Sequence, residues 1–140
     1  MRFWDSSALV ALFVSQMASP DVRDLRRTDS EVLAWTMTDV EIHSAPARLA
    51  REGALLPAEV QDIQMRVASF WRSVHQVSLL EPVKVRARRL LGVHPLRAAD
   101  SLQLGAALAG CFDEPLGVEF VCLDVRLSDA ARREGFAVVP

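Results

Sequence analysis

Residues 2–14, RFWDSSALVALFV, decide the fold that the rest of the chain follows. Three residues typical of a strand lead into Asp5, and two serines then open an apolar helix. No charged residue occurs from Ser6 to Pro20, which indicates a helix that is buried on most sides. Asp5 is therefore a carboxylate between two buried elements, where an ionised group is costly unless a positive charge pairs with it. The rest of the chain must compensate this charge.

Length and composition are typical of a single globular domain. The 140 residues are 51% hydrophobic and 24% charged, which allows a proper core and excludes a disordered or collagen-like chain. The net charge of −2 provides no overall basic field, so any contact with nucleic acid has to be local. We expect one domain over residues 1–140.

The cysteines and the apolar segments bear on where the protein acts. Cys111 and Cys122 have neither metal-binding nor redox spacing, which favours a reduced protein. The apolar run near the N-terminus has an acid at position 5 and suits a core helix, so we do not interpret it as a signal peptide. No stretch approaches the roughly 18 apolar residues of a membrane span. These features predict a cytoplasmic protein with no membrane contact.

Short apolar strands alternate with helices along the chain, and no hairpin signal occurs. Strands are expected at 2–4, 31–37, 76–80, 118–123 and 136–139, and helices at 6–14, 20–27, 38–52, 58–75, 83–91, 97–109 and 126–133. Ser19 is a candidate helix cap, and Gly53 and Gly92 are candidate helix ends. The pattern predicts an α/β fold with a short central parallel sheet of about five strands, flanked by helices on both faces.

Four acids occupy positions where the chain is otherwise apolar or turns from strand to helix. Asp5 and Asp124 each follow an expected strand, and the carboxyl ends of parallel strands form one functional edge. Asp100 is the only charged residue in 98–112, within a helix that looks buried nearly all round. Glu41 lies in the first turn of the helix expected at 38–52. We expect these four acids to meet at one edge of the sheet.

Each acid also has a purely structural explanation. Glu41 lies three residues after a threonine, which is the spacing of a capping box. Asp124 fits an N-cap, as does either Asp5 or Ser6, and Asp100 fits a helix-dipole charge. Taken together, four acids at one edge instead favour a carboxylate cleft that Mg²⁺ or Mn²⁺ would stabilise. The residues alone leave both explanations open.

Four blocks of the sequence resemble the PIN-domain nucleases, and they are most similar to the VapC toxins of bacterial type II toxin–antitoxin systems. The blocks are DSSAL at 5–9, T-x-x-E at 38–41, LRAADSLQL at 96–104 and FVCLD-x-x-L at 120–127. The match covers nearly the whole chain in order and spacing. The block at 96–104 is the most specific of the four.

The resemblance implies a single PIN-like domain that acts as a Mg²⁺- or Mn²⁺-dependent endoribonuclease. It assigns the metal-binding and catalytic acids to Asp5, Glu41, Asp100 and Asp124, with Glu41 as ligand or general base. The hydroxyl that usually follows the first acid corresponds to Ser6. On this interpretation the capping box at Glu41 becomes the weaker explanation. The implied reaction is hydrolysis of an RNA phosphodiester by in-line attack of an activated water.

Neighbours of the acids add two expectations. Arg97 and Arg126 are candidates for phosphate contacts, with ordinary solvated arginines as the alternative. The family usually has Thr or Ser at the position of Cys122. Because a thiol is a poor hydrogen-bond donor, we expect weaker support for Asp124 or for a metal-bound water, and a modified activity rather than an inactive site.

The resemblance also implies partners. They are the RNA substrate, a cognate antitoxin protein, and a second copy of the chain in a homodimer. A C-terminal segment of the antitoxin would lie in a groove between the early helices and present an arginine to the acids. Trp35, Phe70 and Trp71 are expected in the core, with that groove as the alternative.

Other classes of protein share parts of this pattern. A receiver-like signalling domain needs a lysine near the last strands, but Lys84, the only lysine, falls in an expected helix well before them. A haloacid-dehalogenase-type phosphatase needs an aspartate where Ser7 stands. A PIN-fold binding module without catalysis is the remaining alternative, and the presence of all four acids argues against it.

Overall fold

The computed structural model describes residues 1–14 and 20–140, and within them five short strands and seven helices alternate. The strands are β1 (Arg2–Trp4), β2 (Val32–Trp35), β3 (His75–Val77), β4 (Glu119–Val121) and β5 (Ala137–Val139). The helices are α1 (Ser6–Phe13), α2 (Pro20–Thr28), α3 (Thr38–Arg51), α4 (Pro57–Trp71), α5 (Leu80–Val93), α6 (Ala98–Gly110) and α7 (Val125–Glu134). This alternation confirms the predicted α/β class.

All strand pairs are parallel, and the strand order is β3-β2-β1-β4-β5. The chain builds outward from β1 through β2 to β3, and then returns to the other side of β1 with β4 and β5. The order therefore reverses between β1 and β4. In open parallel sheets, ligands bind beyond the carboxyl ends of the strands at this kind of reversal. Asp5 leaves β1 and Asp124 follows β4 at that point.

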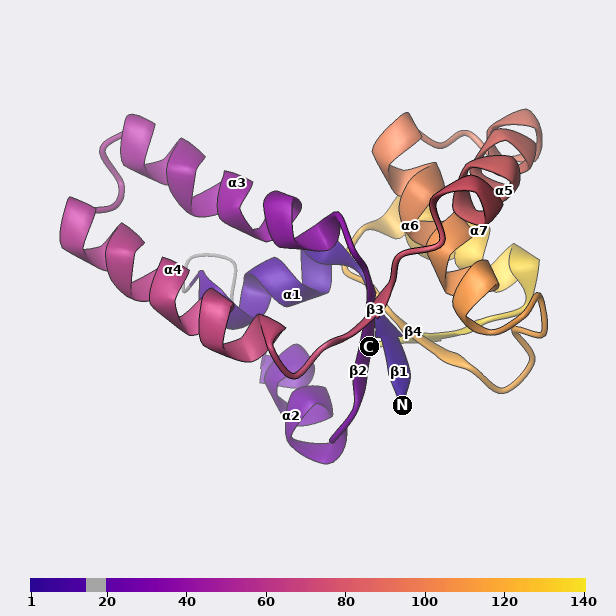
Figure 1. The fold of residues 1–140 in the computed structure, drawn as a ribbon, viewed down its shortest axis with the longest axis horizontal. Helices are drawn as coiled ribbons and strands as arrows, with labels where there is room; N and C mark the ends of the chain where they lie inside the picture. Colours follow the sequence, from indigo (N-terminus) through magenta and orange to yellow (C-terminus); the bar gives the residue numbers. More distant parts are fainter. Residues whose placement is uncertain (15–19) are drawn as a thin grey trace.

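Helices cover both faces of the sheet, as predicted (Figure 1). Phe3 and Phe120 stack with ring centroids 5.3 Å apart in the core on the face that α5, α6 and α7 cover. Trp4 and Val121 follow them directly and belong to the opposite core, beneath α1 to α4. Because successive side chains of a strand point to opposite faces, the three-residue strands β1 and β4 each contribute to both cores.

Some boundaries differ from the prediction for packing reasons. Helix α4 ends at Trp71 rather than at residue 75, because Val74 packs into the core and His75 pairs with β2. Gly92 does not end α5, which continues to Val93 and stops before a proline. Gly53 follows α3 at a positive φ of 75°, as expected of a helix-terminating glycine. The expected cap at Ser19 lies outside the described residues.

The aromatic residues lie in the core or against it. Trp35 is buried, which confirms its predicted place in the core. Phe70 and Trp71 are partly buried against the core beneath α1 to α4, and Phe70 packs edge-on against Phe13 at 5.3 Å. None of the helices within residues 1–14 and 20–140 combines the length and the apolar character that crossing a membrane requires.

Candidate functional site

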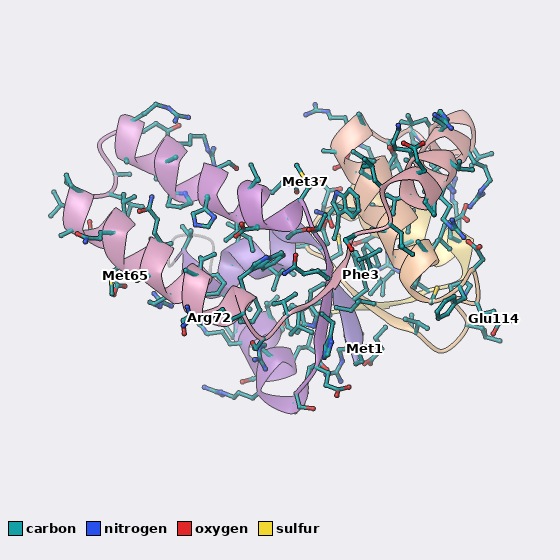
Figure 2. All side chains as sticks on the ribbon, viewed as in Figure 1. Met1, Phe3, Met37, Met65, Arg72 and Glu114 are labelled. Carbon is teal, nitrogen blue, oxygen red and sulfur yellow. The ribbon has the colours of Figure 1, made fainter. Side chains whose placement is uncertain are left out.

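Asp5 lies buried at the carboxyl end of β1, with 2% of its surface exposed. Its backbone N–H donates to the carbonyl of Val121 at 3.0 Å, which joins the end of β1 to β4. Its Oδ2 accepts from the backbone N–H of Ser7 at 3.0 Å and from the Ser7 hydroxyl at 2.5 Å, so Asp5 is the N-cap of α1. In Figure 2, Met37 marks this edge of the sheet and Met1 the opposite edge.

The charge of Asp5 is opposed by its surroundings. The pKa of Asp5 is raised to about 6, chiefly by burial and also by the negative charge of Glu41, against the lowering effect of the bonds from Ser7. No lysine, arginine or histidine in the described part of the chain forms an ion pair with Asp5. The buried acid that needed a cation lies within electrostatic reach of another acid instead.

Ser7 is the serine that supports Asp5 most closely, and the sequence analysis missed it. Its hydroxyl donates to Asp5 and accepts from the backbone N–H of Leu123 at 2.9 Å, so it ties the end of β4 to the acid. Ser6, the residue expected from the resemblance, lies at the long distance of 3.5 Å from Oδ1. An N-cap side chain commonly bonds to the second helical residue, and this rule could have identified Ser7.

Glu41 does not close a capping box. The N-cap of α3 is Met37, so Thr38 is already the first helical residue and Glu41 is the fourth, one position beyond the third helical residue that a capping box uses. The Glu41 carboxylate accepts instead from Nε2 of Gln103 on α6, at 3.0 Å. The same nitrogen lies 2.9 Å from the Thr38 hydroxyl. The local explanation of Glu41 as a cap is wrong, and Gln103 is a second residue that the sequence analysis missed.

Asp124 makes the helix cap that its structural explanation predicts, and Asp100, expected only as a helix-dipole charge, also bonds at a helix end. Oδ1 of Asp124 accepts from the backbone N–H of Leu127 at 2.8 Å, at the start of α7. Oδ2 of Asp100 accepts from the backbone N–H of Arg97 at 3.2 Å, in the first turn of α6. Each carboxylate has its other oxygen free of hydrogen bonds to the described residues. Both acids thus cap helices and keep one oxygen for a further ligand.

Cys122 contacts Asp5 rather than the carboxylate of Asp124. Its sulfur lies 3.5 Å from Oδ2 of Asp5, and also 3.5 Å from the backbone carbonyl of Asp124. Burial, together with the charge of Asp5, raises the pKa of the Cys122 thiol to about 12. The thiol is therefore neutral at ordinary pH. The expectation that this residue supports Asp124 is corrected, because the weak donor faces the first acid.

Arg97 and Arg126 are exposed at the two helix starts that carry Asp100 and Asp124. Neither guanidinium forms an ion pair with another side chain in residues 1–14 and 20–140. Arg126 lines a shallow hollow at the start of α7 together with Leu123 and Asp124. Their role in phosphate contact stays a prediction.

The donor chemistry of the four acids suits a hard divalent cation, since each supplies carboxylate oxygens. Within the described residues, however, no three His, Cys, Asp or Glu side chains are grouped so that they could hold a metal ion. Asp5 and Glu41 fit a cation site best, because the first is buried and the charge of the second reaches it. Asp100 and Asp124 direct one oxygen each to a helix end. Among the described residues the structure thus shows an electrostatic interaction between Asp5 and Glu41, and the assignment of all four acids as ligands stays a prediction.

Comparison with known proteins finds relatives that match this chain over nearly its whole length. No model of a protein family matches it. Two relatives are "Ribonuclease VapC45" of Mycobacterium tuberculosis (strain CDC 1551 / Oshkosh) and "Ribonuclease VapC49" of Mycobacterium tuberculosis (strain ATCC 25618 / H37Rv). Each is 30% identical over 138 residues, which span 99% of this chain and 94% of the relative.

Proposed function

The chain belongs to the VapC family of PIN-domain proteins, and we propose that it is a Mg²⁺- or Mn²⁺-dependent endoribonuclease, the toxin of a type II toxin–antitoxin pair. The observation that carries this proposal is the buried Asp5 carboxylate, whose charge is opposed by Glu41 and is paired with no cationic side chain in the described part of the chain. Strongly perturbed carboxylates of this kind are typical of functional sites. The names of the two relatives support RNA as the substrate.

The residues proposed to hold the metal are Asp5, Glu41, Asp100 and Asp124. Bound Mg²⁺ or Mn²⁺ would supply a polarised water and stabilise negative charge on the phosphate. Asp100 and Asp124 would take part through the carboxylate oxygen that makes no hydrogen bond to the described residues, while their other oxygens stay bonded at the helix ends.

The chain's own side chains prepare the site for an anionic substrate. Ser7 holds Asp5 through two hydrogen bonds, so the carboxylate is oriented before any ligand arrives. Glu41 is proposed as ligand or general base. Arg97 and Arg126 lie exposed beside the outer acids and are proposed to contact phosphates, since the net charge of −2 supplies no general attraction for RNA.

A groove between α1 and α4 supports the proposed antitoxin contact. It is lined by Phe13, Leu55 and Ile63, with Glu59 and Arg66 among its polar residues. We propose that an antitoxin segment lies there and that an arginine of this segment reaches the acids. The protein is further proposed to act in the cytoplasm as a homodimer. Exposed aliphatic side chains on or beside α5 support association: Leu79, Leu80, Val85, Leu91 and Val93.

Cleavage of RNA by the purified protein tests the proposal. We expect cleavage with Mg²⁺ or Mn²⁺ and none with a chelator present. Asp5→Asn should lower the rate by more than about 100-fold, because even outer partners of metal ligands cost about 10–100-fold when replaced. The control is Asp24→Asn, an exposed acid on α2 that pairs with Arg27. Full activity of Asp5→Asn would contradict the proposal.

The same experiment separates the catalytic protein from a PIN-fold binding module. A module without catalysis would bind RNA and leave it intact under all metal conditions. A receiver-like domain is disfavoured by Lys84, which lies on α5 and forms an ion pair with Glu81 at 2.7 Å.

Induced expression should stop growth, and Asp5→Ala or Asp100→Ala should relieve that arrest. A small adjacent reading frame that cancels the arrest would identify the antitoxin.

A further inference from the structure

Gln103 is a polar side chain that α6 buries at the candidate site. Only 1% of its surface is exposed, and its neighbours on the helix are apolar, as in the run from Leu104 to Ala109. It lies one helical turn after Asp100, so α6 directs both residues towards neighbouring parts of the same region. Its amide reaches from α6 across to the first turn of α3.

The contacts of Gln103 are concentrated on the two residues at the start of α3. Its Nε2 donates to the Thr38 hydroxyl at 2.9 Å and to Oε2 of Glu41 at 3.0 Å, which uses both protons of the amide nitrogen. If the amide were flipped, its oxygen would face the Glu41 carboxylate. Both groups are acceptors, so no hydrogen bond could form between them. The Glu41 contact therefore dictates which way the amide faces.

This orientation leaves the amide oxygen of Gln103 buried and without a hydrogen-bond partner among the described residues. A buried acceptor that lacks a partner lowers stability. A leucine of similar size would fill an apolar site without that cost. The amide is thus a poor choice for stability alone, which points to a role in the contact with Glu41.

We propose that Gln103 is a positioning residue, which holds the Glu41 carboxylate beside Asp5 through its Nε2–H groups. The inference rests on the proposed function and deepens it. Asp5 and Glu41 repel each other, so Glu41 would otherwise turn towards solvent, to which it is partly exposed. Gln103 restrains it with a neutral donor. A lysine or arginine there would neutralise the acid and compete with a divalent cation, whereas an amide leaves the full negative charge available.

Substitution of Gln103 tests the proposal in the full-length protein. Gln103→Leu should fold, lower kcat about 10–100-fold, leave KM for RNA within about 2-fold, and weaken Mn²⁺ binding by a similar 10–100-fold. Gln103→Met keeps the side-chain length without donors and serves as the second variant. Circular dichroism and thermal unfolding confirm the fold, and calorimetric titration with Mn²⁺ alone gives a readout independent of activity.

The matched control is Ser101→Ala, which removes a buried hydroxyl from the same helix. That hydroxyl donates to the carbonyl of Ala98 within α6, so its loss should leave kcat and Mn²⁺ affinity unchanged. A double-mutant cycle on Mn²⁺ affinity then asks whether Gln103 acts through Glu41. Adding Gln103→Leu to Glu41→Ala should weaken Mn²⁺ binding no further.

Each outcome decides between the positioning role and a structural one. Unchanged Mn²⁺ affinity and kcat in Gln103→Leu would overturn the inference, as would equal losses in Ser101→Ala. A full additional loss in the Glu41→Ala background would also overturn it. A wild-type protein that does not cleave RNA overturns the proposed function itself, and the Mn²⁺ titration of Gln103→Leu then still decides the positioning role. A wild type that cleaves RNA while Gln103→Leu is unaffected refutes the positioning role alone.

Discussion

Asp29 and Asp5 lie at opposite ends of β1, and both are almost fully buried, with 3% and 2% exposed. Oδ2 of Asp29 accepts from the indole N–H of Trp4 at 2.7 Å, and its Oδ1 lies 3.7 Å from the N-terminal ammonium. Asp5 accepts from Ser7 and from the weak donor Cys122, and the charge of Glu41 opposes its ionisation. One three-residue strand thus separates a compensated acid from an uncompensated one.

The comparison shows that burial alone does not mark a functional acid. Asp29 is held by a positive charge and a strong donor, which is how a structural carboxylate is stabilised. Glu134 follows the same rule, with Arg89 at 2.5 Å and His94 at 2.7 Å. Asp5 departs from it, and a destabilising arrangement of this kind is characteristic of functional sites. Four predictions test this difference, and the first has the largest expected effect.

Asp29→Ala should lower the free energy of unfolding by about 2–3 kcal/mol, because it leaves the buried indole N–H of Trp4 without an acceptor. Chemical denaturation measures the change. Asp24→Ala, an exposed acid paired with Arg27, is the control and should stay within about 0.5 kcal/mol of the wild type. A loss below 1 kcal/mol for Asp29→Ala would show that this acid is not a structural anchor.

Asp5→Asn should change the free energy of unfolding in the opposite direction. It should raise this free energy by up to about 2–3 kcal/mol at pH 7.5 in metal-free buffer. The folded pKa of Asp5 is about 6 against the ordinary value of 3.8, so the folded protein binds more protons between those values. Its contribution to stability is complete below about pH 4 and is lost as pH rises through about 6. The gain of Asp5→Asn should therefore shrink on acidification below pH 6. A constant difference between pH 4 and 8 would refute this account.

Glu134→Ala should lower the free energy of unfolding at pH 7 by about 1–2 kcal/mol, since the buried His94 and the exposed Arg89 lose their acceptor. The bonds from Arg89 and His94 hold the pKa of Glu134 below its ordinary value of 4.5. Its contribution is present above about pH 4.5 and is lost as pH falls through the lower folded pKa. Denaturation at several pH values should show the wild-type advantage vanish in acid, the reverse of the Asp5 case.

Cys122→Ser should have the smallest effect. A hydroxyl donates more strongly than a thiol, so it should stabilise the ionised Asp5 and shift its pKa down from about 6, by less than about one unit. The carboxyl-carbon resonance of Asp5, followed by NMR against pH, measures this shift. Cys111→Ser, at a partly buried cysteine at the C-cap of α6, is the control. An upward shift would show that the sulfur does not support the acid.

The sequence by itself determined the architecture, since that information is local. Apolar runs of strand length alternating with helical periodicity predicted a five-stranded parallel sheet covered on both faces, and the structure confirms it. The isolation of Asp5 and Asp100 in apolar surroundings was visible in composition alone. The family could also be predicted from the sequence, because its motifs are short blocks at fixed positions. The similarity to VapC proteins over nearly the whole chain confirms that prediction.

The tertiary structure alone decided how the site is assembled. The strand order places β1 beside β4. The Ser7 hydroxyl, just after β1, can therefore accept from the backbone N–H of Leu123, just after β4. The rotation of α6 against α3 brought Gln103 to Glu41, and the packing of β1 against the chain after α2 brought Asp29 to Trp4. These contacts join residues far apart in the chain. They depend on how whole elements pack, which the periodicity within any one element does not encode.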